Sequence, residues 1–270
     1  MTLPATDSRH YIVILELRSA EDCPPDFELP DSLAGFDAGL FLPGDAWPPR
    51  VLLLERGALT IVSHPSSAEP VHRWDMRQIS SVESGHMLLK GWLRFTGSGF
   101  DYTVRYNTRG LPAVGRFMAR FRSAFLRGAR VRDAREVQLG ERLDIKFANA
   151  LEAELDAAET LCRQFFQPPE VSKRRRLPGD LLALTDRRLL WITDRENGFR
   201  SRYGSIASYA PLDAVSHIAL APDGLQVDLN GSARWQVPIA PAYRQAVEEL
   251  LSGAGWHPGW HPAGPKGYPW

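Results

Sequence analysis

The chain is poor in cysteine and carries no net charge. Only two cysteines occur in 270 residues, at Cys23 and Cys162, so neither a disulfide scaffold nor a cysteine-ligated zinc site is expected. The 32 basic and 32 acidic residues cancel, so attraction to nucleic acid or to an anionic membrane has to come from a local patch. We expect a protein of a reducing cytoplasm with no nucleic-acid partner.

Long hydrophobic runs are missing near the N-terminus. The longest apolar segment there, Tyr11 to Leu15, is far below the roughly 20 residues of a membrane-spanning helix. Residues 1–10 contain no basic region leading into an apolar stretch, as a secretory signal would. These features predict a soluble chain.

Catalytic motifs are missing as well. The sequence contains no G-x-x-x-x-G-K-[ST] phosphate loop, no G-x-S-x-G elbow and no H-E-x-x-H zinc pair. Five of the seven histidines are scattered without a carboxylate or nucleophile at a telling spacing, namely His10, His64, His72, His86 and His217. We therefore predict that the protein is not an enzyme and needs no cofactor.

A weak internal repeat relates the first half of the chain to the second, in periodicity more than in identity. Two apolar strands joined by a short polar turn are predicted at 51–63 and again at 181–193. The apolar positions of 74–82 coincide with those of 210–218. Two further strands with alternating apolar side chains follow in each half, which predicts one buried face.

Each half then ends in an amphipathic helix. Both helices have a proline in the first turn and a glycine just past the end, at Pro112 to Gly128 and at Pro241 to Gly253. The apolar stripes consist of Val114, Phe117, Met118, Phe121 and Phe125 in the first helix, and of Tyr243, Ala246, Val247 and Leu250 in the second. Short antiparallel strands followed by such a helix describe a bent sheet or partial barrel plugged by the helix. We predict that each stripe is buried against the strands of its own half.

One motif of the second half resembles a known family. Thr185-Asp186-Arg187-Arg188 joins two apolar strands, and Pro211-Leu212-Asp213-Ala214-Val215 follows. This combination resembles the bacterial PH-like (pleckstrin-homology-like) domain families, and the resemblance covers roughly Leu155 to Gly253. The segment from Leu40 to Gly128 matches by pattern only, with Glu55-Arg56-Gly57 in place of the motif's turn. The resemblance implies two tandem PH-like copies.

The predicted fold class is α+β, mainly β, with two tandem PH-like partial barrels of bent antiparallel sheet, each closed by a C-terminal amphipathic helix. Residues 1–135 are the predicted N-terminal PH-like domain with an extra strand and loop segment, and 156–254 are the C-terminal one. Residues 255–270 are a Trp/His/Pro-rich flexible tail.

A connecting helix is predicted at 136–155. Its apolar residues recur on one side, at Leu143, Phe147, Leu151 and Leu155. A helix with one apolar stripe needs a surface to cover. We predict that it packs at the junction and holds the two domains in a fixed relation.

A basic run, Lys173, Arg174, Arg175 and Arg176, is the sharpest functional signal, because the repeat places it in the first hairpin loop of the second domain. In lipid-binding PH domains, the resemblance implies, that loop presents lysines and arginines to inositol phosphates. A later loop adds Arg195, Arg200 and Arg202 to this predicted ligand-binding group. The alternative is a solvated loop whose charges keep the chain soluble.

For two other groups of arginines we favour a structural interpretation. Arg187 and Arg188 are predicted to form a turn in which Asp186 bonds the turn backbone. The first closing helix carries Arg116, Arg120, Arg122 and Arg127 beside its phenylalanine stripe, as a membrane-surface helix would. One stripe cannot both plug a barrel and enter a membrane. A core role is favoured, which leaves the arginines as a patch for an acidic protein or lipid headgroups.

The tail repeats a Gly-Trp-His-Pro unit and is not expected to be helical. His257 and His261 lie four residues apart, but a Pro/Gly chain does not fix their geometry, and no acidic or thiol ligand lies near. No metal site is predicted. We predict instead that Trp256, Trp260 and Trp270 dock into a groove, on a partner or on this protein's own surface.

The sequence thus predicts a non-catalytic binding or scaffold module whose tandem PH-like domains dock a protein partner. Peripheral recruitment to anionic membrane lipids, through the basic loop of the second domain, is the alternative. Salt separates the two hypotheses, because binding to a charged membrane weakens steeply as ionic strength rises. We expect a cytoplasmic protein, attached to the inner face of the membrane in the second case.

Overall fold

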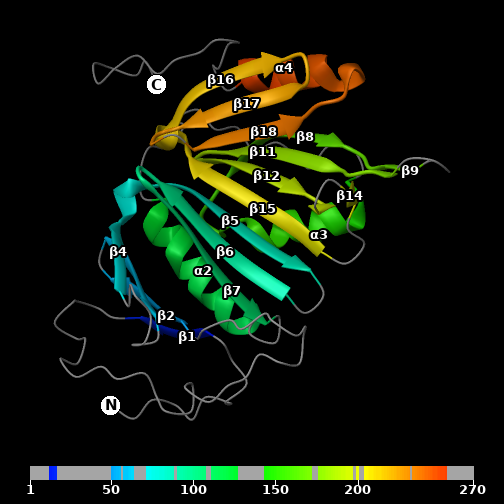
Figure 1. The fold of residues 1–270 in the computed structure, drawn as a ribbon. Coiled ribbons are helices and arrows are strands. Elements are labelled where there is room, and N and C mark those ends of the chain that lie inside the picture. The colour runs from blue at the N-terminus through cyan, green and yellow to red at the C-terminus, as the bar shows by residue number, and fades with distance from the viewer. Residues whose placement is uncertain are drawn as a thin grey trace, which may run out of the picture.

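The computed structural model describes residues 12–16, 50–55, 57–63, 71–87, 90–107, 111–126, 143–171, 176–196, 199–200, 204–231 and 233–253. The fold is mainly β with helices, as predicted for the α+β class, and its sheets are almost wholly antiparallel (Figure 1). Within these ranges no helix is both long enough and apolar enough to cross a membrane.

The first half forms a four-stranded sheet, a short 3-10 turn, three further strands and a helix. In chain order these are β1 (Ile12–Glu16), β2 (Arg50–Glu55), β3 (Ala58–Ser63), β4 (Val71–Asp75), η2 (Met76–Gln78), β5 (Ile79–Met87), β6 (Lys90–Gly97), β7 (Phe100–Asn107) and α2 (Leu111–Phe125). β1 pairs with β2 in parallel, and the other neighbouring strands are antiparallel. Asp75 caps η2 by accepting from the Arg77 N–H at 2.8 Å.

The second half repeats this order of elements. A helix, α3 (Ile145–Glu154), precedes it, and two short hairpins lie between its longer strands. The elements are β8 (Leu161–Gln167), β9 (Glu170–Val171), β10 (Arg176–Leu177), β11 (Asp180–Thr185), β12 (Arg188–Thr193), β13 (Arg195–Glu196), β14 (Phe199–Arg200), β15 (Gly204–Pro211), η4 (Leu212–Ala214), β16 (Val215–Ala221), β17 (Gly224–Leu229), β18 (Arg234–Pro238), η5 (Pro241–Tyr243) and α4 (Arg244–Gly253). The 3-10 turns η2 and η4 fall in the two segments whose apolar positions coincide in the sequence.

Strands of the two halves join in one sheet of seven. Its order is β7-β6-β5-β15-β12-β11-β8, and the junction is the antiparallel pair of β5 with β15, from Val82 opposite Tyr209 to Met87 opposite Gly204. In Figure 1 the yellow β15 lies directly beside β5. A separate sheet, β16-β17-β18, completes the second half. Because the sheet runs across the predicted domain boundary, the division into 1–135 and 156–254 stays a prediction.

Two hydrophobic cores lie on opposite faces of this sheet. Successive strand residues point to opposite faces, and β11 accordingly sends Leu181 and Ala183 into one core and Leu182 and Leu184 into the other. The first core combines residues of both halves, whereas the second is built from β8 to α4. β11 is therefore buried along its whole length.

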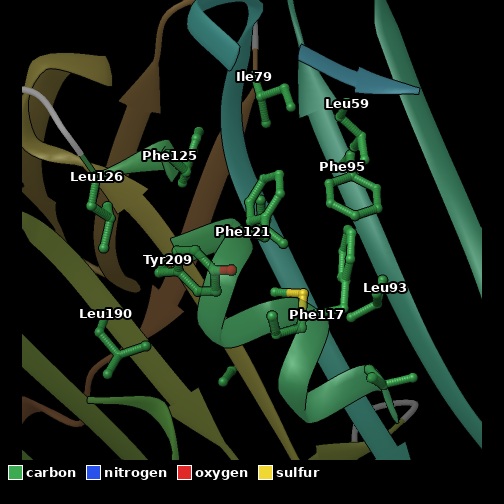
Figure 2. Packing of buried hydrophobic residues seen from close by; sticks show 14 of the residues in the cluster. Leu59, Ile79, Leu93, Phe95, Phe117, Phe121, Phe125, Leu126, Leu190 and Tyr209 are labelled. Atoms are coloured by element: carbon green, nitrogen blue, oxygen red, sulfur yellow. The ribbon is translucent and has the colours of Figure 1, made fainter. Parts of the chain in front are cut away.

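Helix α2 packs as predicted against the strands of its own half, and also against the second half. Val114, Phe117, Phe121 and Phe125 are buried in the first core. Figure 2 shows Phe117 and Phe121 between the side chains of Leu93 and Phe95 and those of Leu190 and Tyr209, with Phe125 on the Tyr209 side. The ring of Phe125 meets that of Tyr209 at 6.1 Å. The burial of Val247 and Leu250 of α4 in the second core is also confirmed. Of the other residues of that predicted stripe, Ala246 is exposed, and Tyr243 lies half-buried in η5 before the helix.

The connecting helix packs at the junction, as predicted. Asp144 caps α3 by accepting from the Lys146 N–H at 2.9 Å. Phe147 and Leu151 are buried in the first core, with Leu143 and Leu155 packed against it, and α3 lies against β12 and β15. The first seven residues of the predicted helix, 136–142, lie outside the described ranges.

A candidate binding cleft

A cleft of about 750 Å³ opens where β5 and β6 of the first half face the β17–β18 hairpin of the second. Its floor lies on the sheet face opposite α2. Val82 and Tyr209 point into the first core beneath α2, so their neighbours Glu83 and Ser208 point the other way, into the cleft. The cleft therefore exists only because the two halves share one sheet.

One row of directly opposed residues crosses the floor. Trp191 of β12 faces Ser208 of β15, which faces Glu83 of β5. Glu83 faces Arg94 of β6, which faces Thr103 of β7. The first four residues of the row line the cleft, and Thr103 lies beyond it. Opposed side chains in a sheet are close enough to interact, so the row forms a continuous polar strip with an indole at one end.

Glu83 is held in place by a tryptophan. The side chain is half-buried, and its Oε1 accepts a hydrogen bond from the indole Nε1–H of Trp92, with 2.6 Å between Nε1 and Oε1. Trp92 reaches it by lying across Gly85, since a Cβ at that glycine would stand 2.1 Å from ring atom Cζ2. A side chain at residue 85 would displace the ring, so Gly85 is required for the position of Glu83.

The two arginines of the cleft are each paired with an aspartate. Arg94 makes a bidentate ion pair with Asp101, at 2.7 Å from Nε to Oδ1 and 2.5 Å from Nη2 to Oδ2. The hydrogen bond from Arg94 lowers the pKa of the Asp101 carboxyl. Arg234 of β18 donates from Nε to Oδ1 of Asp228 at 2.5 Å. Both pairs are partly exposed, so their charges are well hydrated as well as balanced.

Two tryptophans line the end of the cleft that lies away from Arg94 and Asp101. The rings of Trp191 and Trp235 are tilted with centroids 6.4 Å apart. Trp191 donates from Nε1 to Oδ1 of Asp180 at 3.0 Å, and burial of Asp180 raises the pKa of that carboxyl. Oδ2 of Asp180 lies 3.4 Å from Nη2 of Arg195. A buried carboxylate thus orients the Trp191 indole.

A contact between two turns closes one end of the cleft. Gly231, in the turn after β17, has φ of 83°, and a Cβ there would stand 2.5 Å from Cα of Ser98 in the turn between β6 and β7. The Ser80 hydroxyl also donates to the Asn230 carbonyl. Only glycine fits this approach without moving the turns apart.

The predicted basic group is placed only in part. Lys173, Arg174, Arg175 and Arg202 lie outside the described residues, as do Trp256, Trp260 and Trp270 of the tail. Arg176 belongs to β10 and Arg200 to β14, and these strands lie side by side. Arg200 also stands opposite Arg195 in the β13–β14 pair. Three of the predicted residues are thus brought together, although the Arg195 charge is offset by Asp180.

The structural turn predicted at Arg187 and Arg188 is confirmed, with a different residue holding it. The Thr185 hydroxyl accepts from the Arg187 and Arg188 N–H groups at 3.1 and 3.0 Å. The prediction that Asp186 bonds the turn backbone is wrong, because its carboxylate accepts from the Thr160 N–H at 2.9 Å and so ties the turn to the segment before β8.

Arg122 does not belong to a surface patch on α2. It is buried and donates from Nη1 to Glu154 Oε2 of α3 at 2.8 Å. Arg116 and Arg120 are exposed on the same helix, and Arg127 lies outside the described residues. The arginine patch expected there loses one of its members to an ion pair between the two helices.

The cleft offers hydrogen bonds, charges and aromatic surface, which are the means of binding. In the described part of the chain no group of three or more His, Cys, Asp or Glu side chains is arranged to hold a metal ion. Sequence reasoning missed Glu83, Arg94, Trp191 and Trp235. Polar residues alternating with buried ones on β5 and β6 are a signal for a solvent-facing side, but they do not reveal which strand lies beside them.

A comparison of the chain with protein-family models finds no match, and a comparison with curated proteins finds none either. The resemblance to PH-like domains therefore stays a hypothesis that rests on the sequence motif and on the repeated order of elements. The function has to be argued from the cleft itself.

Proposed function

We propose that the chain is a non-catalytic binding module built from two PH-like units, and that it docks a segment of a protein partner in the cleft between them. The repeated order of four strands, a 3-10 turn, three strands and a helix supports the two units. The first unit contributes β5 and β6 to the cleft, and the second contributes β12, β15 and the β17–β18 hairpin.

The composition of the cleft is the observation that carries this proposal. Its lining contains two acids, Glu83 and Asp101, and two arginines, Arg94 and Arg234, together with Trp191 and other aromatic residues. A polyphosphate site needs an excess of converging cations, and here each arginine already has its aspartate. Charges of both signs, tryptophan and scattered hydroxyls suit a polypeptide, since protein interfaces are rich in aromatic residues and arginine with a polar rim.

Filling the cleft tests the proposal. Thr96 of β6 lines it, and Thr103 of β7 lies on the same sheet face outside it. A Thr96→Trp chain should lose the partner that wild type captures from its native cells, measured by quantitative mass spectrometry, whereas the matched Thr103→Trp chain should keep it. Equal recovery with both variants would exclude the cleft as the docking site.

Recruitment to anionic membrane is the second candidate function. The adjacency of β10, β13 and β14, which carry Arg176, Arg195 and Arg200, favours it. Flotation with phosphatidylserine vesicles tests it, because binding through these charges has to fall steeply between low and physiological salt. Salt-independent flotation, or none at low salt, would exclude it.

A further inference from the structure

We propose that the cleft recognises a cationic side chain, a lysine or arginine of the docked segment, with its charge on Glu83 and its stem against Trp191 and Trp235. This inference rests on the proposed function and adds the chemistry of the ligand to it. It predicts that the partner segment is basic, whereas the membrane hypothesis predicts that the chain binds an anionic surface.

The charges of the cleft single out Glu83. Arg94 is committed to Asp101, and Arg234 to Asp228. Across the described residues no lysine, arginine or histidine is ion-paired with Glu83. Arg94 stands opposite it on the neighbouring strand, but the pKa of Arg94 is raised mainly by its hydrogen bond with Asp101 and only secondarily by the charge of Glu83. Asp228 pairs with Arg234 without itself lining the cleft, so three carboxylates meet two guanidinium groups, and Glu83 is the one without an ion pair. An unpaired carboxylate in a partly desolvated cleft favours a cation from outside.

The carboxylate is also positioned before any ligand arrives. Trp92 holds Oε1, and Gly85 allows Trp92 to lie where it does. Oε2 makes no hydrogen bond with the described part of the chain. One oxygen is thus fixed by the protein and the other is open to a ligand, so little ordering of Glu83 remains to be done on binding.

The tryptophans supply the second half of the recognition. Trp191 lies two strands from Glu83 in the same cross-strand row, so the backbones of the two residues are about 9.6 Å apart, or two strand spacings. Indole faces attract lysine and arginine cations, and the methylene stems of these side chains cover apolar surface well. The hydrogen bond to buried Asp180 orients the Trp191 ring, as the hydrogen bond from Trp92 orients Glu83.

Indole resonances report this binding directly. The probes are pentapeptides of four glycines around one central lysine, arginine, norleucine or glutamate, titrated into the full chain with ¹⁵N-labelled tryptophan. The lysine and arginine peptides should shift the Nε1–H signals of Trp92 and Trp191 in a saturable way, and the norleucine and glutamate peptides should not. Equal shifts from norleucine, or no shift from lysine, would overturn the inference.

Glu83→Gln isolates the charge, because the amide oxygen still accepts from Trp92. We expect this substitution to lower the affinity for the lysine peptide by about tenfold or more, because one partner of a charge pair is lost. Glu152→Gln, an equal change at an exposed site on α3 across the sheet, should leave affinity unchanged. Matching melting temperatures show that both variants fold.

The same variants separate the two proposals. If Glu83→Gln keeps wild-type affinity for the lysine peptide while Thr96→Trp loses the cellular partner, the cation inference falls and the docking function stands. If Thr96→Trp retains the partner, the docking function itself fails.

Discussion

Arg188 has no exposed surface and lies between Glu159, the Glu154 carbonyl and the ring of Tyr209. Its guanidinium donates to both oxygens of Glu159, at 2.8 and 2.6 Å, and its carbon Cζ stands 4.8 Å from the Tyr209 centroid. A buried pair of this kind contributes little over a hydrophobic replacement of both residues, but losing one partner strands the other charge. The last arginine of the Thr-Asp-Arg-Arg motif is therefore a structural residue.

Arg188→Ala should lower the free energy of unfolding by about 3–5 kcal/mol, because Glu159 is left buried without its counter-ion. Chemical denaturation followed by circular dichroism measures this. Arg163→Ala, at an exposed site on β8, is the control and should change stability by no more than about 0.5 kcal/mol. A double variant, Arg188→Met with Glu159→Leu, should recover most of the loss. If Arg188→Ala and Arg163→Ala changed the free energy of unfolding equally, the prediction would be contradicted.

Among the elements, strands and helices were predictable where one face is buried. Phe117, Phe121 and Phe125 recur at helical spacing and mark the buried side of α2. The pairing of β5 with β15 was not predictable, because backbone hydrogen bonds between strand edges leave no mark on side chains. One signal did exist: Leu181 to Leu184 is an unbroken apolar run, which is typical of a strand covered on both faces.

The cleft illustrates the same limit. Glu83 and Ser208 are more than a hundred residues apart in sequence, and each resembles an ordinary outward-facing polar residue of an antiparallel strand. Only the β5–β15 pairing puts them opposite one another. The basic run at 173–176, in contrast, is conspicuous in sequence, although the structure places only the strand residue Arg176 beside β14.

The basic loop allows a test of the membrane hypothesis. If the loop binds headgroups, replacing Arg174, Arg175 and Arg176 with alanine removes three charges worth about 1 kcal/mol each near an anionic surface. We expect a roughly hundredfold loss of affinity for phosphatidylserine vesicles. The control replaces three exposed arginines of the first half, Arg77, Arg105 and Arg116, for the same change in net charge. Equal losses in both variants would mean that the loop has no special role.

In the whole molecule, the shared sheet makes each half depend on the other. Without the first half, the β15 edge would lose its partner β5, and the Tyr209 ring would lose its contact with Phe125 of α2. The ion pair of Arg122 with Glu154 and the packing of Phe147 and Leu151 tie α3 into the same core. Independent domains joined by a linker show small, polar interfaces, whereas this junction is continuous with the first core.

We predict that the chain unfolds in one cooperative transition, because the first core contains residues of both halves. Leu251→Ala, in the second core, should cost about 2–5 kcal/mol. If unfolding is cooperative, this change speeds global hydrogen exchange of amides in β6 of the first half by the same free energy, and calorimetry still shows a single peak. Glu249→Ala, at an exposed site of α4, is the control and should alter neither. Two calorimetric peaks, or β6 amides indifferent to Leu251→Ala, would show that the halves unfold separately and that the β5–β15 pair is too weak to couple them.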